Sequence, residues 1–264
     1  MRSTDTHKMY YLKQMVMGRR SSIEKWIPDP SVLPGQISPH DMDTILSLVS
    51  IAENSQTTWW NNYNYAENIG DGRGITVGVV GFCTGTGDLV QVFDVLSRIN
   101  PKHAMLRFHG ALRAIDKRGG GSDTKGLDGF EEEVHKLGED KDWIRAQWIV
   151  LAREYINPAF QQCVKHNAKS NFAFGFLFDI ALNHGPDRCK MFANTAAMQA
   201  VKEKDFLSHL ITVRTRAIQS FDRDTNDGQT DRCKMWRSIL DTGNLRLQRP
   251  LKNLVCYGDK FQIL

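Results

Sequence analysis

Residues 172–182 form the segment that most restricts how this chain can fold. They read Phe-Ala-Phe-Gly-Phe-Leu-Phe-Asp-Ile-Ala-Leu, which is apolar on almost every side of a helix. Such a helix leaves no face for water and predicts a central position with other helices packed around it. Gly185 can close the helix and Pro186 cannot continue it, so His184 is interpreted as a structural residue at the helix end. Asp179 lies inside the run, and a buried carboxylate needs a partner, for which an arginine fits best.

The rest of the pattern is also mostly helical. Apolar residues recur at helical spacing in several further segments, among them 38–54, 89–99, 195–220 and 231–242. β-Rich sequence is limited to one region near residues 70–88, in which Ile75 to Phe82 is predicted to form a strand between two glycine-rich turns. Repeated strand–helix–strand units are absent from the pattern. The predicted fold class is therefore mainly α, an α+β protein with one small sheet.

The first 37 residues are predicted to be a basic arm, followed by one domain over residues 38–264. The arm ends in a stretch that is interrupted by Pro28, Pro30 and Pro34. Its first residues lack the basic-then-apolar order of a signal peptide, so either the protein leaves its cell by another route or the chain is not the full precursor. No run approaches the ~20 continuous apolar residues of a membrane span, and no membrane partner is expected.

The cysteines give no sign of a metal site or a disulfide framework. They are odd in number, widely spaced and without a Cys-x-x-Cys pair: Cys83, Cys163, Cys189, Cys233 and Cys256. Five buried or half-buried thiols are predicted, and one isolated bridge stays open as an alternative. Residues 222–228 resemble a calcium loop, but the glycine falls one position late, so a polar turn is predicted. No metal and no cofactor are expected.

Charge is unevenly distributed along the chain. The net charge is +4, yet residues 53–94 contain five acidic residues and only one basic residue, Arg73. An acidic region on a basic body favours a cationic ligand over a nucleic acid. A solvated acidic face without a ligand remains the alternative at this point.

Two of these carboxylates have the placement of a catalytic pair. Ser38 and Pro39 begin a helix whose last turn carries Glu53, where the negative end of the helix dipole disfavours a charged carboxylate. That position suits a group that must hold a proton as a general acid. Asp71 follows 18 residues later in the glycine turn of residues 70–74. Inverting glycosidases use two carboxyl groups about 6.5–9.5 Å apart, but spacing in the sequence alone favours two unrelated surface carboxylates over such a pair.

Other motifs fail or stay ambiguous. The glycine-rich stretch at residues 81–88 lacks the Gly-Lys-Ser/Thr ending of a phosphate loop and ends in Asp88, which would repel phosphate. Neither a Gly-x-Ser-x-Gly elbow nor a His-Glu-x-x-His helix occurs. The aromatic and amide-rich residues 59–65 suit stacking on sugars and core packing equally well.

Short motifs resemble the chitosanases of glycoside hydrolase family 46. Ser-Ile-Ala-Glu-Asn-Ser (50–55), Ile-Gly-Asp-Gly-Arg-Gly (69–74) and Gly-Phe-Cys-Thr-Gly-Thr-Gly-Asp (81–88) match that family in order and spacing. His-Gly-Pro (184–186), Gly-Asn-Leu (243–245), Pro-Leu-Lys (250–252) and Tyr-Gly-Asp (257–259) extend the resemblance. It covers about residues 40–262 and excludes the first 37 residues and the loop near 115–140.

The resemblance implies a two-lobed, lysozyme-like fold and endo-hydrolysis of β-1,4 linkages between glucosamine units with inversion. The minor lobe, around residues 56–110, would hold the small sheet, and the major lobe, the remainder, would hold the central buried helix. Chitosan is the implied partner, with no nucleic acid, no membrane and a monomeric, secreted protein. A muramidase or chitinase on the same fold and a non-catalytic wall-binding module remain the alternatives.

The resemblance also assigns roles to single residues. It implies Glu53 as general acid, Asp71 as general base and Thr76 as a residue that helps to hold the attacking water. It implies substrate contacts from four residues, namely Tyr65, Arg73, Asp88 and Ser55, and a structural role for Trp59. Behind the acid it implies an ionic network of Asp179, Arg214 and Arg232.

Overall fold

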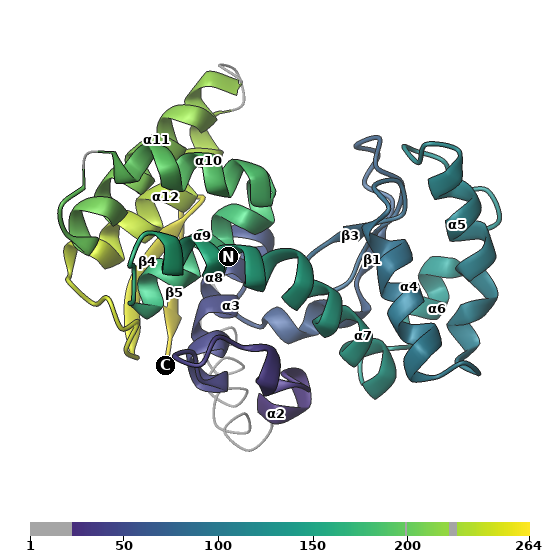
Figure 1. The fold of residues 1–264 in the computed structure, drawn as a ribbon. Helices are drawn as coiled ribbons and strands as arrows, with labels where there is room; N and C mark the ends of the chain where they lie inside the picture. The colour runs from purple at the N-terminus through teal and green to yellow at the C-terminus, as the bar shows by residue number, and fades with distance from the viewer. Residues whose placement is uncertain (1–22, 199, 222–225) are drawn as a thin grey trace, which may run out of the picture.

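Helices make up most of the computed structural model, which describes residues 23–198, 200–221 and 226–264. Two lobes lie side by side in Figure 1. The larger lobe contains α3 (Pro39–Asn54), α8 (Asn157–Lys165), α9 (Asn171–His184), α10 (Pro186–Ala197), α11 (Glu203–Phe221) and α12 (Asn226–Asp241). The predominantly helical class predicted from the sequence is confirmed.

The apolar run of residues 172–182 lies within helix α9, which occupies the centre of the larger lobe. Its residues from Phe172 to Ala181 are all buried. Gly175 lets two other helices approach closely, because a Cβ at this position would lie 3.0 Å from Ile45 of α3 and 3.1 Å from Trp236 of α12. The prediction of a central buried helix is therefore confirmed.

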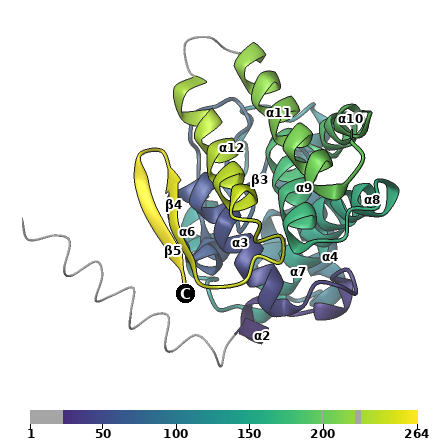
Figure 2. The same ribbon diagram turned by 90° about the vertical axis from the view of Figure 1, so that its left-hand side faces the viewer.

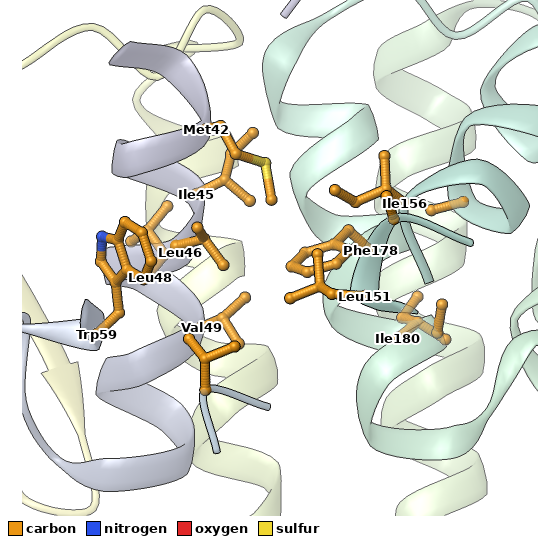
Figure 3. Close-up of a cluster of buried hydrophobic side chains, with 14 of the residues drawn as sticks. Met42, Ile45, Leu46, Leu48, Val49, Trp59, Leu151, Ile156, Phe178 and Ile180 are labelled. Carbon is orange, nitrogen blue, oxygen red and sulfur yellow. The ribbon is translucent and has the colours of Figure 1, made fainter. Parts of the chain in front are cut away.

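Helix α3 packs one apolar face against this centre. Figure 3 shows Met42, Ile45 and Val49 directed towards Phe178 of α9, with Leu151 beside it. Ser38 caps the helix as predicted: the Ser38 hydroxyl accepts a bond from the Asp41 backbone N–H at 3.1 Å, and the Asp41 carboxylate accepts one from the Ser38 backbone N–H at 3.0 Å. This reciprocal cap fixes the start of the helix that carries Glu53 at its far end.

The smaller lobe contains an antiparallel sheet of short strands in the order β1 (Ala66–Glu67), β2 (Thr76–Val77) and β3 (Phe82–Cys83). The prediction of a single strand from Ile75 to Phe82 is wrong, because the chain reverses between β2 and β3. Gly78 and Gly81 adopt φ angles of 80° and 76°, which turn the chain back on itself. Gln147 secures this turn, since its Oε1 accepts the Val79 backbone N–H at 2.9 Å.

Helices cover the sheet of the smaller lobe. They are α4 (Asp88–Ile99), η3 (Ala104–Phe108), α5 (His109–Lys117) and α6 (Phe130–His135). Helix α6 packs directly on β1, with His135 Nε2 3.0 Å from the Ala66 carbonyl oxygen. The predicted boundary of this lobe near residue 110 thus falls too early, because α5 and α6 belong to the same packed unit.

A long helix that contains one π-helical turn connects the lobes (Figure 1). It runs from α7 (Lys141–Leu151) through the π-helical turn η4 (Ala152–Ile156) into α8 without a break. Trp148 of α7 donates from Nε1 to the Asp29 carbonyl oxygen at 3.0 Å. This bond holds the segment that precedes α3 against α7. The segment contains α2 (Ile23–Trp26) and η1 (Pro30–Val32).

The predicted basic arm is only partly described. Residues 1–22 lie outside the described residues. Residues 23–37 pack on the body, with Ile27, Leu33 and Ile37 buried, so the predicted arm does not extend to residue 37.

A second small sheet was not predicted. β4 (Leu251–Cys256) and β5 (Asp259–Ile263) form an antiparallel hairpin that lies against α12 and α3 (Figure 2). Its turn places Tyr257 and Gly258 at φ angles of 52° and 81°. The prediction of a single β-region is therefore wrong.

All five cysteines are buried free thiols, which confirms the prediction for them and removes the open alternative of one bridge. Of the polar turn predicted at residues 222–228, residues 222–225 lie outside the described residues. Within the described part of the chain, none of the helices combines the length and apolar content that a membrane span requires.

Candidate active site

A groove of about 560 Å³ lies between the two lobes. One wall comes from the larger lobe, with Glu53 of α3 and the junction between α9 and α10. The opposite wall comes from the sheet of the smaller lobe and the start of α4. Five residues predicted for the site line this groove: Glu53, Tyr65, Arg73, Thr76 and Asp88. Two predicted residues, Asp71 and Ser55, are not part of its lining.

Glu53 lies on the last turn of α3 with 38% of its side chain exposed. Arg232, which is nearly fully buried, donates from Nη1 to Glu53 Oε1 at 2.5 Å. The carboxyl group is therefore anchored from behind and open towards the groove. This anchoring leaves one carboxyl oxygen available to a ligand.

The ionic network predicted behind Glu53 is brought together in the fold. Asp179 is fully buried and accepts bonds from Arg232 Nε at 2.8 Å, from Arg214 Nη1 and from Trp236 Nε1 at 3.1 Å. Burial alone would raise the pKa of Asp179, but Arg232 and Arg214 hold that pKa below its usual range. Burial likewise opposes the charge of Arg232, and Asp179 and Glu53 overcome it and raise the pKa of Arg232.

Arg214 extends this network to the groove wall. Its Nη2 donates to Asn183 Oδ1 at 3.1 Å, and its Nε donates to His184 Nε2 at 3.2 Å. His184 accepts this bond at Nε2, so that nitrogen carries no proton. Burial and then the charge of Arg214 lower the pKa of His184 to about 4. The interpretation of His184 as a structural residue at a helix end agrees with this contact.

Asp71 lies at the edge of the groove and is paired with Arg73. The Arg73 side chain donates from Nε to Asp71 Oδ2 at 2.8 Å, and the Arg73 backbone N–H donates to Asp71 Oδ1 at 3.0 Å. These bonds lower the pKa of Asp71, so the group stays ionised at neutral pH. About 30% of the Asp71 side chain is exposed, and Arg73 itself lines the groove next to it.

Thr76 and Asp88 lie on the wall of the smaller lobe. Thr76 Oγ1 is 3.6 Å from Cys83 Sγ, its partner across the β2–β3 hairpin. Asp88 begins α4, and its Oδ1 accepts bonds from the Cys83 backbone N–H at 2.8 Å and from the Thr86 hydroxyl at 2.7 Å. Burial raises the pKa of Asp88 despite these bonds. Asp88 therefore ionises at a higher pH than an aspartate in water, and a nearby positive charge would favour its ionised form.

The remaining predicted residues occupy different positions. The Tyr65 hydroxyl donates to Glu67 Oε2 at 2.9 Å, and burial followed by this bond raises the pKa of Tyr65 to about 12. Trp59 is buried and donates from Nε1 to Asp43 Oδ1 at 2.8 Å, as expected for a structural residue. Ser55 is the exposed residue that ends α3 in a left-handed conformation, with a φ angle of 50°.

Two groove residues were missed from the sequence. Tyr155 of η4 lines the groove, and burial followed by the charge of Asp88 raises its pKa to about 12. In the sequence Tyr155 stands at an apolar position of a helical pattern, and its hydroxyl is the signal that could have marked it as a groove residue. Asn183 directly precedes the His-Gly-Pro motif, and this position is the signal that could have found it.

The described residues contain no group of three or more His, Cys, Asp or Glu side chains that could hold a metal ion. The arrangement instead offers two differently placed acids. Glu53 is held by a buried arginine on one wall, and Asp71 is kept ionised by Arg73 at the edge of the other. Two acids placed on either side of a groove between two lobes are the arrangement that glycoside hydrolases with a lysozyme-like fold use.

Comparisons with known proteins agree with this class. The sequence model of glycosyl hydrolase family 46 matches residues 47–251. A chitosanase of Nocardioides sp. (strain N106) is 31% identical over 241 residues, which cover 87% of this chain and 84% of that protein. The native chitosanase from Bacillus subtilis MY002 superimposes with a TM-score of 0.76 at 27% identity, over 85% of this chain and 98% of that one. A mutant of that enzyme complexed with 6 GlcN gives a TM-score of 0.75 at 26% identity, over 85% and 98% of the two chains.

The chain belongs to glycosyl hydrolase family 46. The lysozyme-like fold expected from the sequence motifs is confirmed by these structural neighbours.

Proposed function

We propose that this protein is a chitosanase that hydrolyses β-1,4 linkages within chains of glucosamine. The observation that carries the proposal is the groove between the lobes, with Glu53 on one wall and the Asp71–Arg73 pair and Asp88 on the other side. Family membership and the chitosanase relatives support the same reaction. The acidic side of the groove suits a polymer whose amino groups are protonated.

In the proposed mechanism Glu53 is the general acid and gives its proton to the glycosidic oxygen. Asp71 is the general base and takes a proton from a water molecule that attacks the opposite face of the sugar ring, which inverts the anomeric carbon. Arg73 keeps Asp71 ionised for this step, and the Thr76 hydroxyl helps to hold the water. The two carboxyl groups supply both the acid and the base, so the reaction calls for no metal or cofactor.

The charge balance behind Glu53 affects its role as an acid. Arg214 and Arg232 face a single aspartate, Asp179, so one positive charge is left over when Glu53 is protonated. That charge stabilises the carboxylate that forms once Glu53 has given up its proton. Asp179, Arg214 and Arg232 therefore act through Glu53 and are positioning residues.

Substrate recognition is proposed to come from the wall of the smaller lobe. Asp88 attracts a protonated amino group, and Tyr65 and Arg73 contact the sugar units next to it. Ser55 lies outside the groove lining and would contact a polymer that extends past α3.

The decisive experiment measures new reducing ends released from chitosan, chitin and peptidoglycan. Chitosan is expected to be cut far faster than the other two polymers. Glu53→Gln should lose about 10²–10⁴-fold in kcat, the usual share of general acid catalysis, and thermal melting checks that the variant is folded. Glu139→Gln is the matched control, since Glu139 is an exposed surface residue paired with Lys25. Full activity in Glu53→Gln would overturn the proposed acid and favour a binding module.

Stereochemistry tests the inverting mechanism separately. Proton NMR of the first product should show the α-anomer before mutarotation, because hydrolysis inverts a β-linkage. A β-anomer would instead require a covalent intermediate and a different role for Asp71.

We further propose that the enzyme acts outside the cell, because a polysaccharide such as chitosan cannot cross a membrane. We also propose that the enzyme is a monomer. Size-exclusion chromatography with light scattering should give a mass close to the 30.0 kDa of one chain.

A further inference from the structure

Cys83 and Thr76 lie next to each other on the smaller-lobe wall of the groove. They are direct partners in the β2–β3 hairpin, and both residues line the groove. Thr76 Oγ1 and Cys83 Sγ are 3.6 Å apart, a contact in which either atom could be the hydrogen-bond donor. The direction of this bond decides what the Thr76 hydroxyl can offer to a molecule in the groove.

The single proton of the Cys83 thiol is directed at the backbone of the hairpin turn. Burial raises the pKa of Cys83, so the thiol keeps its proton at neutral pH. Cys83 Sγ donates this proton to the Gly81 carbonyl oxygen at 3.4 Å. A thiol has one donor and a weak acceptor, so the sulfur can only accept from Thr76. The Thr76 hydroxyl therefore donates to Cys83 and keeps its oxygen lone pairs for the groove.

Gly81 also restricts how the Thr76 side chain can turn. A Cβ on Gly81 would lie 3.3 Å from Thr76 Cγ2, so the Thr76 methyl group lies close to the backbone of the hairpin turn. The branched side chain of threonine has few favourable χ1 angles, and its methyl and hydroxyl groups move together. Packing of the methyl group therefore holds the hydroxyl at Cys83.

A water molecule that attacks a sugar needs an acceptor at this position. The water oxygen turns a lone pair towards the anomeric carbon, so both of its protons point away from that carbon. In the proposed mechanism Asp71 accepts one of these protons, and a second acceptor must face the other. A donating Thr76 hydroxyl would leave that second proton unpaired and would withdraw electron density from the attacking oxygen.

We propose that Cys83 is a positioning residue, whose sulfur accepts the Thr76 proton and so makes the Thr76 oxygen the acceptor that orients the attacking water. This inference rests on the proposed function, in which Asp71 is the base and Thr76 holds the water. Cys83 acts through Thr76 and takes no part in proton transfer to or from the sugar.

Kinetics of a double-mutant cycle test the coupling of Cys83 to Thr76. Cys83→Ala should lower kcat on chitosan by about three- to tenfold, the effect of one neutral hydrogen bond, and leave KM unchanged. Cys83→Ser keeps a donor and an acceptor and should retain more of the kcat than Cys83→Ala. In a Thr76→Val background the same Cys83→Ala change should have no further effect on kcat, because no hydroxyl is left to orient.

Raman spectroscopy tests the hydrogen bond without using activity. The S–H stretching band of Cys83 is the band that Cys83→Ala removes from the wild-type spectrum. This band should shift in Thr76→Val, because a sulfur that accepts a hydrogen bond makes its own S–H group a stronger donor.

Cys189→Ala is the matched control. Cys83 and Cys189 are equally buried, with 1% of each residue exposed, and Cys189 Sγ also donates to a backbone carbonyl oxygen, that of Leu177 at 3.3 Å. Cys189 lies in α10, outside the lining of the groove. The control removes the same kind of buried thiol and should leave kcat and KM unchanged. Thermal melting checks that each variant is folded.

An equal loss of kcat for Cys83→Ala with and without the Thr76 hydroxyl would overturn the inference, because the loss would then come from packing. A wild-type kcat in Cys83→Ala would overturn it too, as would an S–H band that Thr76→Val leaves in place. The same loss of kcat in Cys189→Ala would show a general effect of removing a buried thiol. A wild-type enzyme that leaves chitosan uncut would instead refute the proposed function, while the S–H band would still decide whether Thr76 donates to Cys83.

Discussion

Three carboxylates in and beside the groove have different hydrogen-bonding partners. Glu53 is anchored by the buried Arg232, Asp71 is bonded twice to Arg73, and Asp88 is bonded only to neutral donors. Their residue types alone would give similar proton affinities. The surrounding donors lower the pKa of Asp71, while burial raises that of Asp88.

The raised pKa of Asp88 predicts a pH-dependent affinity for chitosan. Asp88 attracts an ammonium group only when ionised, so KM should rise as the pH falls through a pKa that lies above the usual value of an aspartate. Asp88→Asn should raise KM about tenfold or more and remove this rise at low pH, since a charged hydrogen bond is lost. Initial rates on chitosan across the acidic pH range provide the measurement. An Asp88→Asn variant whose KM keeps the wild-type pH dependence would contradict the role of Asp88.

At the level of elements, backbone contacts between glycines fix the turn that carries Asp71 and Arg73. The Gly85 backbone N–H donates to the Arg73 carbonyl oxygen at 2.9 Å, and the Gly121 N–H donates to the Gly85 carbonyl oxygen at 3.0 Å. A Cβ on Gly120 would lie only 2.1 Å from the Gly85 carbonyl oxygen. The loop of residues 119–121 therefore supports the candidate base from behind, although the family resemblance in the sequence did not include this loop.

Gly120→Ala is expected to lower kcat by about 10–100-fold, because the added methyl group must push Gly85 and the Arg73 turn out of place. Gly119→Ala is the matched control: its φ of 97° is also positive, but nothing lies within 4 Å of an added Cβ. Both variants share the backbone strain of a side chain at positive φ, so both melting temperatures should fall, and that of Gly120→Ala should fall further because its Cβ also clashes with the Gly85 backbone. Kinetics on chitosan and thermal melting measure the two effects. An equal loss of kcat in both variants would show that strain, and not the contact with Gly85, explains the result.

The sheets were harder to predict than the helices for a physical reason. Each strand of the sheet β1–β3 has only two residues, so alternation of apolar and polar positions cannot be seen. In the C-terminal hairpin a bulge between Leu251 and Leu254 interrupts the alternation, and the turn is made by Tyr257-Gly258 without the usual Asn-Gly signal.

At the level of the whole molecule, one network joins four segments that are distant in the sequence. Glu53 at the end of α3 contacts Arg232 of α12, which contacts Asp179 of α9, which contacts Arg214 of α11. Arg214 then reaches the end of α9 at Asn183 and His184. The position of the candidate acid therefore depends on the correct packing of the larger lobe.

The contact between Arg214 and His184 predicts that the protein loses stability in acid as His184 becomes protonated. Its pKa of about 4 in the folded protein lies below the usual value of 6.5, so the unfolded chain binds a proton more readily between these pH values. Stability should consequently decrease as the pH falls from about 6.5 to about 4, by roughly 1–3 kcal/mol for this group. His184→Gln keeps an acceptor for Arg214 without a titrating group and should show a smaller decrease. Denaturant unfolding at several pH values tests this; a slope unchanged in His184→Gln would refute the assignment.

The sequence by itself determined the central helix, the cap and end of the helix with Glu53, the glycine turn with Asp71 and the family. These features are local, because apolar periodicity, capping residues and short motifs act over a few neighbouring residues. Only the tertiary structure decided that α5 and α6 belong to the smaller lobe, that Ser55 lies outside the groove and that Asp71 is held by Arg73 at its edge. It also decided that Arg214 fixes the amide of Asn183, 31 residues away along the chain. Such pairings depend on how whole helices pack, and no local pattern in the sequence encodes the packing of two side chains that meet only after folding.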